Sequence, residues 1–287
     1  MNKIENILLQ TKFIQNKNWL KAVNILKEAI NKYPQEKMLY KNLADIYSKQ
    51  KLYRKAIENY QYALFIDVND ENINYLIGNC FLSLKEPRLA IDYYNKVKIT
   101  FPELLYNKAV AYSNIKKYEI GIDIIKELLK LNATSEVPYV LIAELYISLN
   151  KFDDAINYLI TAEKIVGKSG ILHYMKGATY SHKKIWLKAY FEFQNADKFK
   201  MNIPHFYRSY AVSCEKIGKI NKAIDLLKKN INLEPNDTPT YIELLKIYLT
   251  HENFSKAFEL INAAKKNIPF TIPLLVLYDE LIHKIKS

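Results

Sequence analysis

Small residues recur along the chain at a nearly constant spacing, and larger apolar residues lie between them at helical intervals. One set is separated by steps of 34 residues and a single step of 31: Ala22, Ala56, Ala90, Gly121, Ala155, Ala189, Ala223 and Ala257. Most members have a second small residue twelve positions before them and a third seven positions after them. Two helices can cross closely only where side chains are small, and larger residues fill the space around the crossing. The pattern therefore predicts a series of helix pairs.

The prolines test this register independently. They all fall at unit ends or junctions or in the first turn of a predicted helix: Pro34, Pro87, Pro102, Pro138, Pro204, Pro235, Pro239, Pro269 and Pro273. A first-turn proline is tolerated because its missing N–H would have no partner within the helix. The step of 31 residues separates Ala90 from Gly121, and its three missing residues are lost between Ile99 and Leu105. Here we expect a tighter turn between units and a local change in superhelical angle.

This pattern resembles the tetratricopeptide repeat family, whose members stack helix-turn-helix units of 34 residues. Its clearest copies here run from Tyr40 to Ala44 and from Tyr139 to Ala143. The resemblance implies an all-α, right-handed α-solenoid that forms a single domain over residues 1–287. The implied repeats are approximately 3–36, 37–70, 71–101, 102–135, 136–169, 170–203, 204–237 and 238–271. A capping helix over 272–286 follows, and we expect Leu275, Tyr278 and Ile282 on its apolar face.

Composition excludes several other classes of protein. The 6 Gly and 9 Pro are too few for an all-β chain, and 49% hydrophobic with 13% aromatic residues is enough to bury a core. Cys80 and Cys214 lie far apart within predicted helices, so we expect buried structural thiols. No apolar stretch reaches the roughly 18 residues of a membrane span, and the first residues lack a signal-peptide core. We therefore expect a cytoplasmic protein.

The search for catalytic and metal-binding residues predicts none. Ala162 with Gly167, Lys168 and Ser169 has the spacing of a phosphate-binding loop, but it falls at the end of a predicted helix instead of after a strand. The five histidines show no zinc-ligand spacing. We expect a protein without catalytic activity, cofactor or metal ion.

In the tetratricopeptide repeat family, the first helix of each repeat lines a groove that binds extended or helical peptides. Carried over residue by residue, the resemblance implies a peptide-binding groove containing Lys41, Asn42, Tyr75, Asn79, Tyr106, Asn107, Val110, Val140, Glu144, Tyr174 and Arg208. Tyr and Arg are favoured interface anchors, although such a Tyr can also pack within its own helix pair. Some members bind a C-terminal carboxylate through basic residues. Asp45 and Glu103 would repel a carboxylate here, so that clamp is absent.

The charge is concentrated in the turns within the repeats. The chain has 42 basic and 30 acidic residues, a formal net charge of +12. We define the basic edge as the turn residues Lys49, Lys51, Lys85, Lys116, Lys117, Lys151, Lys183, Lys184, Lys216 and Lys219. Lysine at a helix C-terminus is favoured by the helix dipole whatever the function. The sequence therefore predicts a protein-interaction scaffold with a protein or peptide partner, and the alternative is RNA or anionic-surface binding through the basic edge.

Overall fold

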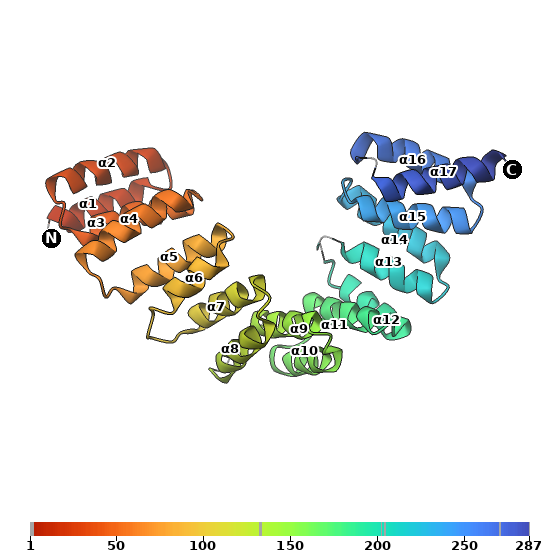
Figure 1. Cartoon of the computed structure of the whole chain (residues 1–287), viewed down its shortest axis with the longest axis horizontal. Helices are drawn as coiled ribbons and strands as arrows, with labels where there is room; N and C mark the ends of the chain where they lie inside the picture. Colours follow the sequence, from red (N-terminus) through yellow and green to blue (C-terminus); the bar gives the residue numbers. More distant parts are fainter. Residues whose placement is uncertain (1–2, 132–133, 202, 204, 270, 287) are drawn as a thin grey trace. The chain divides into compact units, whose positions relative to one another are not determined.

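In the computed structural model, residues 3–131, 134–201, 203, 205–269 and 271–286 are described, and every regular element among them is a helix (Figure 1). The chain forms two compact units, unit 1 (Met1–Ala133) and unit 2 (Thr134–Ser287). Unit 1 contains α1 (Lys3–Ile14), α2 (Trp19–Lys32), α3 (Lys37–Lys49), α4 (Tyr53–Ile66), α5 (Glu71–Ser83), α6 (Pro87–Tyr94), α7 (Pro102–Asn114) and α8 (Tyr118–Lys130). Unit 2 contains α9 (Val137–Ser148), α10 (Phe152–Val166), α11 (Gly170–His182), α12 (Trp186–Asp197), α13 (Phe206–Lys216), α14 (Ile220–Leu233), α15 (Thr238–Thr250), α16 (Phe254–Asn267) and α17 (Ile272–Lys286). The predicted all-α class is confirmed.

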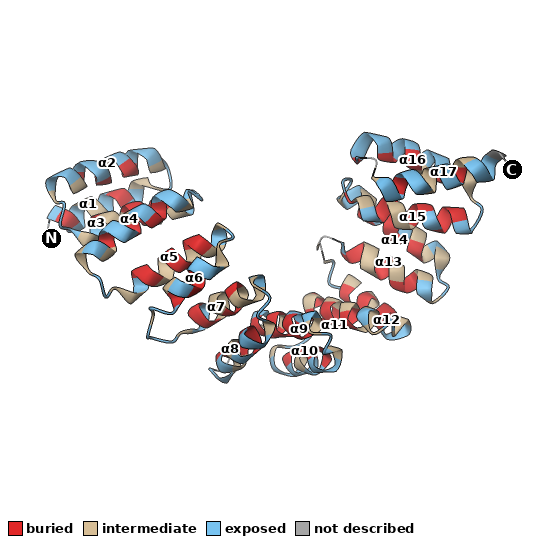
Figure 2. Cartoon of the chain, in the orientation of Figure 1, coloured by how far each residue is buried: buried red, intermediate tan, exposed pale blue. Residues whose placement is uncertain are grey.

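Within each unit, consecutive helices pack against one another, so buried residues follow the sides that face a neighbour (Figure 2). The recurring small residues of the sequence pattern lie at these contacts, and Ala22, Ala56 and Ala155 are completely buried. Cys80 and Cys214 are also buried free thiols, as predicted, and burial raises the pKa of both.

At two crossings, a glycine on the first helix lies against an aromatic ring of the second helix. A Cβ atom at Gly177 would lie 2.8 Å from the ring of Phe193, and one at Gly78 would lie 2.4 Å from the ring of Tyr94. At the equivalent positions of the preceding helix pair in unit 2, the buried residues are Ala143 and the smaller Leu159. Glycine on the first helix therefore makes room for the aromatic ring at these two crossings, whereas the equivalent crossing of α3 and α4 pairs Ala44 with Tyr60.

The turn inside a helix pair has one repeated backbone conformation. In seven of these turns the residue two positions after the first helix has a positive φ: Lys51, Lys85, Lys116, Asn150, Lys184, Gly218 and Glu252. Around Lys51, its N–H donates to the Ser48 carbonyl and the Leu52 N–H donates to the Tyr47 carbonyl, both at 2.9 Å. This pair of hydrogen bonds is the Schellman motif, and it recurs in the other six turns.

Replacing Lys51 with glycine tests this assignment, because the left-handed conformation costs a residue with a Cβ atom roughly 1–2 kcal/mol. Glycine avoids this cost, but its greater conformational freedom in the unfolded chain lowers the free energy of unfolding by about 0.5–1 kcal/mol. We expect Lys51→Gly to raise the free energy of unfolding by up to about 1 kcal/mol, measured by urea denaturation. The control Lys27→Gly, at an exposed position inside α2, should lower it by about 1 kcal/mol. Equal losses in both variants would contradict the assignment.

The shortened repeat differs from the sequence prediction. Helix α6 has only 8 residues, and residues 95–101 separate it from α7. The predicted tighter turn is therefore wrong, because the missing residues come from the helix and the connection is longer than the one between α4 and α5. The Oε2 atom of Glu71 accepts hydrogen bonds from the N–H groups of Lys98 and Ile99, both at 2.9 Å. A side chain thus satisfies backbone donors in the segment where the helix has already ended.

Helix α17 packs against α15 and α16 at the end of unit 2. Its buried side chains are Leu274 and Leu281, whereas Leu275 is 43% exposed. The prediction that Leu275 lies on the apolar face is therefore wrong, because the preceding residue, Leu274, is the buried one. Of the prolines expected in a first helical turn, Pro138 and Pro239 lie there, and Pro204 lies outside the described residues.

Candidate functional site

In unit 1, the predicted groove residues lie on α3, α5 and α7, and their side chains are only half-buried. On α3, the Lys41 Nζ lies 3.0 Å from Asp45 Oδ2, while Asp45 Oδ1 accepts a hydrogen bond from the Tyr60 hydroxyl at 2.5 Å. The ammonium group of Lys41 is thereby paired within its own helix. This pairing agrees with the predicted absence of a carboxylate clamp.

Helices α5 and α7 are joined by a polar network on the same side of unit 1. The Asn107 Nδ2 donates to the Tyr75 hydroxyl at 3.1 Å and to Asn79 Oδ1 at 3.0 Å. The Tyr94 hydroxyl, from α6, donates to the same Asn79 oxygen at 2.8 Å, and burial raises the pKa of Tyr94. The structure thus brings together three predicted residues and adds Tyr94, which sequence reasoning assigned no role in the groove.

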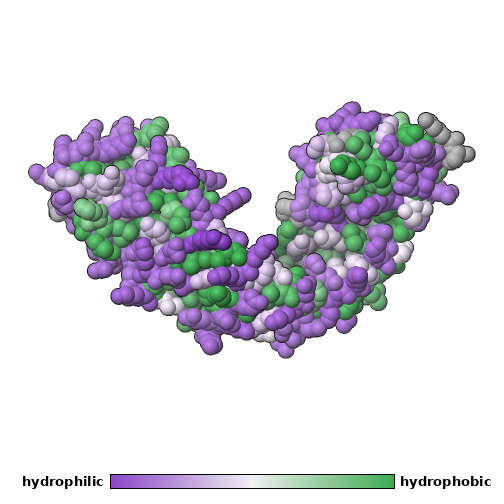
Figure 3. Space-filling model, viewed as in Figure 1, coloured by the Kyte–Doolittle hydropathy of each residue, from purple (hydrophilic) through white to green (hydrophobic). Residues whose placement is uncertain are grey.

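Hydrophobic side chains accompany this network at the surface. The Tyr75 ring packs edge-on against Phe101 at 5.0 Å between centroids, and Tyr106 and Val110 are also half-buried. Figure 3 shows hydrophobic residues between hydrophilic ones over α6 and α7 of unit 1. Asn42, by contrast, donates to the Met38 carbonyl of its own helix at 2.8 Å and joins no network between helices.

In unit 2, the remaining predicted residues lie on α9, α11 and α13. Burial raises the pKa of the Tyr174 hydroxyl, and a hydrogen bond with Ser209 and the charge of Arg208 partly oppose that rise. Glu144 reaches solvent, but partial loss of hydration between the helices raises the pKa of its carboxyl group. Val140 is half-buried one helical turn before Glu144. The charges of Glu144 and Arg208 thus both act on the Tyr174 hydroxyl.

A surface cavity that sequence reasoning missed lies on helices α11–α13 of unit 2. Its volume is about 240 Å³, and it is lined by Ala178, Ser181, His182, Trp186, Phe193, Ser209 and Val212. Ala178 and Val212 occupy the repeat position at which α3, α5 and α9 carry Asp45, Asn79 and Glu144. The two side chains are apolar and shorter than glutamate, and both line the cavity. Their change from polar to apolar residues was the signal available in the sequence.

The basic edge is mostly solvated. All of its lysines are exposed except the half-buried Lys183, which forms an ion pair with Asp153. In unit 1, Arg54 at the start of α4 pairs with Glu86 directly before α6 at 2.7 Å. Acidic residues at the start of the second helices therefore offset part of the positive charge that the turn sequences alone predicted. None of the helices in the described part of the chain is long and apolar enough for a membrane span.

Comparison with known families identifies the repeated unit. The tetratricopeptide repeat model matches residues 102–135 and 138–165, which contain most of α7 to α10 in two successive helix pairs. The chain contains tetratricopeptide repeats. No curated protein sequence matches it. In this repeat protein, the sequence resembling a phosphate-binding loop joins two helices, and its Ala162 is buried in the helix packing.

Solved structures similar to this repeat protein share its fold at low sequence identity. A tetratricopeptide repeat protein from Parabacteroides merdae is 19% identical with a TM-score of 0.67, over 85% of this chain and 97% of that one. A chain of the APC/C hetero-tetramer Cut9–Hcn1 is 15% identical with a TM-score of 0.63, over 98% of this chain and 57% of that one. Yeast Tom70 is 16% identical with a TM-score of 0.63, over 93% of this chain and 59% of its own.

Proposed function

We propose that this repeat protein is a non-enzymatic scaffold that binds a peptide segment of a partner protein along the first helices of its repeats. The observation that carries the proposal is the cavity lined by Ala178, Phe193 and Val212, whose Phe193 ring packs against the half-buried Tyr174. The cavity is open to solvent and mostly apolar, and Ser181 and Ser209 are among its lining residues. Peptide sites combine such an apolar pocket with a few polar groups that orient the backbone.

The ends of this surface carry opposite charges. Glu144 lies on α9, and Arg208 lies on α13, where Asp237 holds its Nε atom at 3.2 Å. A bound segment would place one large apolar side chain in the cavity and polar groups toward these two residues. The half-buried tyrosines Tyr75 and Tyr106 of unit 1 would offer further contacts of the same kind.

We also propose how the helices are grouped into repeats. Each of the eight proposed repeat ranges contains two helices, from α1 and α2 within 3–36 to α15 and α16 within 238–271, and α17 would be the capping helix. A terminal helix of this kind shields a core that has no further repeat beside it. The two buried free thiols support a reducing compartment such as the cytoplasm.

Charge substitution in the cavity tests the peptide-binding proposal. Peptides are first selected with the full chain from a library of random dodecapeptides, and their affinities are then measured by fluorescence anisotropy. We expect Val212→Glu to lower the affinity for the selected peptides at least tenfold. A carboxylate in the cavity would have to lose its hydration when the peptide binds. Leu187→Glu is the matched control, since Leu187 is 57% exposed on α12 and lies outside the cavity lining.

Two results would contradict the proposal. Equal affinity in Val212→Glu and wild type would place peptide binding elsewhere. If the chain instead binds single-stranded RNA with a steep salt dependence that Lys116→Glu and Lys117→Glu abolish, the basic edge is the functional surface. Both lysines are exposed, so these reversals leave the core unchanged.

A further inference from the structure

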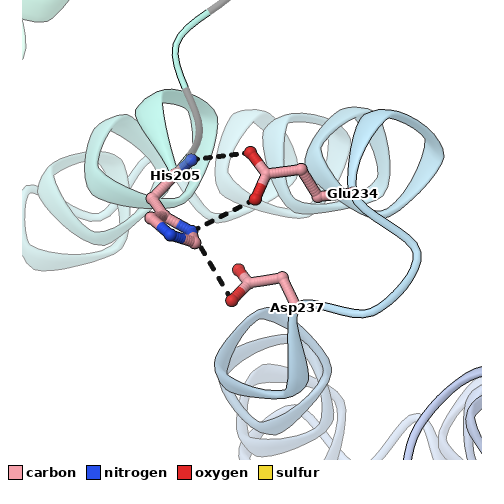
Figure 4. Close-up of side chains that lie close together, drawn as sticks. All are labelled: His205, Glu234 and Asp237. Atoms are coloured by element: carbon pink, nitrogen blue, oxygen red, sulfur yellow. Dashed lines mark hydrogen bonds and ion pairs between the residues drawn. The ribbon is translucent and has the colours of Figure 1, made fainter. Parts of the chain in front are cut away.

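The geometry points to a divalent-metal site in unit 2, formed by His205, Glu234 and Asp237 (Figure 4). The three residues come from different positions in the repeats. His205 directly precedes α13, Glu234 directly follows α14, and Asp237 directly precedes α15. Their side chains converge although the residues occupy no motif in the sequence, which is why the search for zinc-ligand spacing predicted no metal site.

The distances between the three ligand atoms fit a single small ion. His205 Nδ1 lies 3.3 Å from Glu234 Oε2 and 3.6 Å from Asp237 Oδ1, and all three ligand atoms lie within 4.8 Å of one another. Metal–ligand bonds of about 2.0–2.2 Å in a tetrahedron place neighbouring ligands roughly 3.4 Å apart. An ion can therefore sit between these atoms after small side-chain movements.

Other contacts of the two carboxylates orient the proposed ligand atoms. Glu234 Oε1 accepts a hydrogen bond from the backbone N–H of His205 at 2.8 Å, which leaves its Oε2 toward the imidazole. Asp237 Oδ2 contacts Arg208 Nε at 3.2 Å, and its Oδ1 faces His205. The hydrogen bond to Glu234 and the ion pair of Asp237 with Arg208 involve oxygens other than the proposed ligands, and contacts of this type fix ligand orientation in known metal sites.

Asp237 is additionally held from within the core. Its side chain is 5% exposed, and its Oδ2 accepts hydrogen bonds from the Asn230 amide at 3.2 Å and from the Thr240 hydroxyl. The His205 side chain, by contrast, is 49% exposed. The buried Asp237 carboxylate is held rigidly, and the exposed His205 imidazole can be reached by an ion from solvent. A bound ion would have three protein ligands and one coordination position left for water.

Charge and ligand chemistry indicate the class of ion. Two carboxylates face one guanidinium group, so the cluster carries one excess negative charge when His205 is neutral. An imidazole nitrogen combined with two carboxylate oxygens suits a first-row divalent ion such as Zn²⁺ better than Mg²⁺ or Ca²⁺, which prefer oxygen ligands alone. A protonated His205 could instead form ordinary ion pairs with both carboxylates, and the experiment separates these two cases.

Titration with Co²⁺, a spectroscopic substitute for Zn²⁺, tests the site in the full chain after chelator treatment and dialysis. We expect one equivalent to bind with the visible absorbance of a four-coordinate ion, and one equivalent of Zn²⁺ to displace it. His205→Ala and Glu234→Gln should each weaken binding at least tenfold. The glutamine retains an oxygen that can accept the backbone hydrogen bond of His205, so it removes the charge with little structural change.

A histidine elsewhere in unit 2 provides the matched control. His251 is exposed in the turn after α15, and His251→Ala should bind Co²⁺ as the wild type does. Zn²⁺ should also raise the melting temperature of wild type and His251→Ala but not of His205→Ala. Absence of binding, or equal binding by wild type and His205→Ala, would overturn the proposal and leave the cluster as an ion pair alone. Circular dichroism establishes that each variant is folded.

Discussion

Lys176→Met is expected to lower the free energy of unfolding of unit 2 by about 3–5 kcal/mol, the usual cost of removing one partner from a buried ion network. The Lys176 side chain is 6% exposed on α11. Its Nζ atom lies 3.0 Å from Glu163 Oε2 on α10 and 3.2 Å from Glu192 Oε2 on α12. The methionine would fill the same space, but it would leave two partly buried carboxylates without their shared cation.

The neighbouring imidazole cannot replace the lysine. His173 Nδ1 lies 2.6 Å from Glu192 Oε2, whereas its Nε2 lies 3.7 Å from Glu163 Oε1, beyond hydrogen-bond distance. Glu163 therefore loses its close cation in the variant. We expect Lys176→Met with Glu163→Gln to recover a large part of the loss, because one of the two uncompensated charges has been removed.

Fluorescence of Trp186 can follow unit 2 alone, because the chain contains only 2 tryptophans and Trp19, in unit 1, can be replaced by phenylalanine in every variant. The control is Lys164→Met, an exposed lysine on the same helix as Glu163, for which we expect less than about 0.5 kcal/mol. A loss below about 1 kcal/mol in Lys176→Met would show that the network contributes little to the stability of unit 2.

The second large effect is expected from Gly177→Ala, which adds a single methyl group at a helix crossing. That Cβ atom would lie 2.8 Å from two ring atoms of Phe193, and Phe193 is completely buried. Overpacking costs about 1–3 kcal/mol, and the better helix propensity of alanine returns up to about 1 kcal/mol. We expect a net loss of about 1–2 kcal/mol, although alanine normally stabilises a helix.

A double-mutant cycle shows whether the clash with Phe193 is the cause. Gly177→Ala with Phe193→Leu reproduces the pair that unit 2 already contains at Ala143 and Leu159. We expect the double variant to be more stable than the sum of the two single losses by at least about 1 kcal/mol, measured by the same fluorescence method. Additive losses would mean that the ring of Phe193 moves away freely and that glycine is not required.

The sequence predicted the helices well because the forces that specify them are local and repeated. A small residue at each crossing and a proline in the first helical turn both have direct physical reasons, so their spacing located α7, α9 and α15 correctly. The tight turn after α6 was predicted wrongly, because the helix ends early and Glu71, a residue from another helix, accepts hydrogen bonds from the backbone of the longer connection. The apolar face of α17 was misplaced because adjacent apolar residues, Leu274 and Leu275, leave the register ambiguous.

The candidate sites were less accessible to sequence reasoning. The cavity near Val212 depends on what the side chains of three helices leave empty, and repeat position alone does not give that volume. The cluster of His205, Glu234 and Asp237 depends on one histidine with a left-handed backbone, φ 63°, next to two helix ends. Such three-dimensional convergence has no fixed spacing in a sequence.

The Schellman turns accept different side chains at their left-handed position. Backbone hydrogen bonds alone close each of the seven turns, and lysine, asparagine, glycine and glutamate all occupy its left-handed position. Side chains of different charge and length are therefore tolerated at that position, although glycine is expected to be the most stable choice there. Charge, length or a chemical label can be altered there one repeat at a time, while the helices that carry the binding surfaces keep their positions.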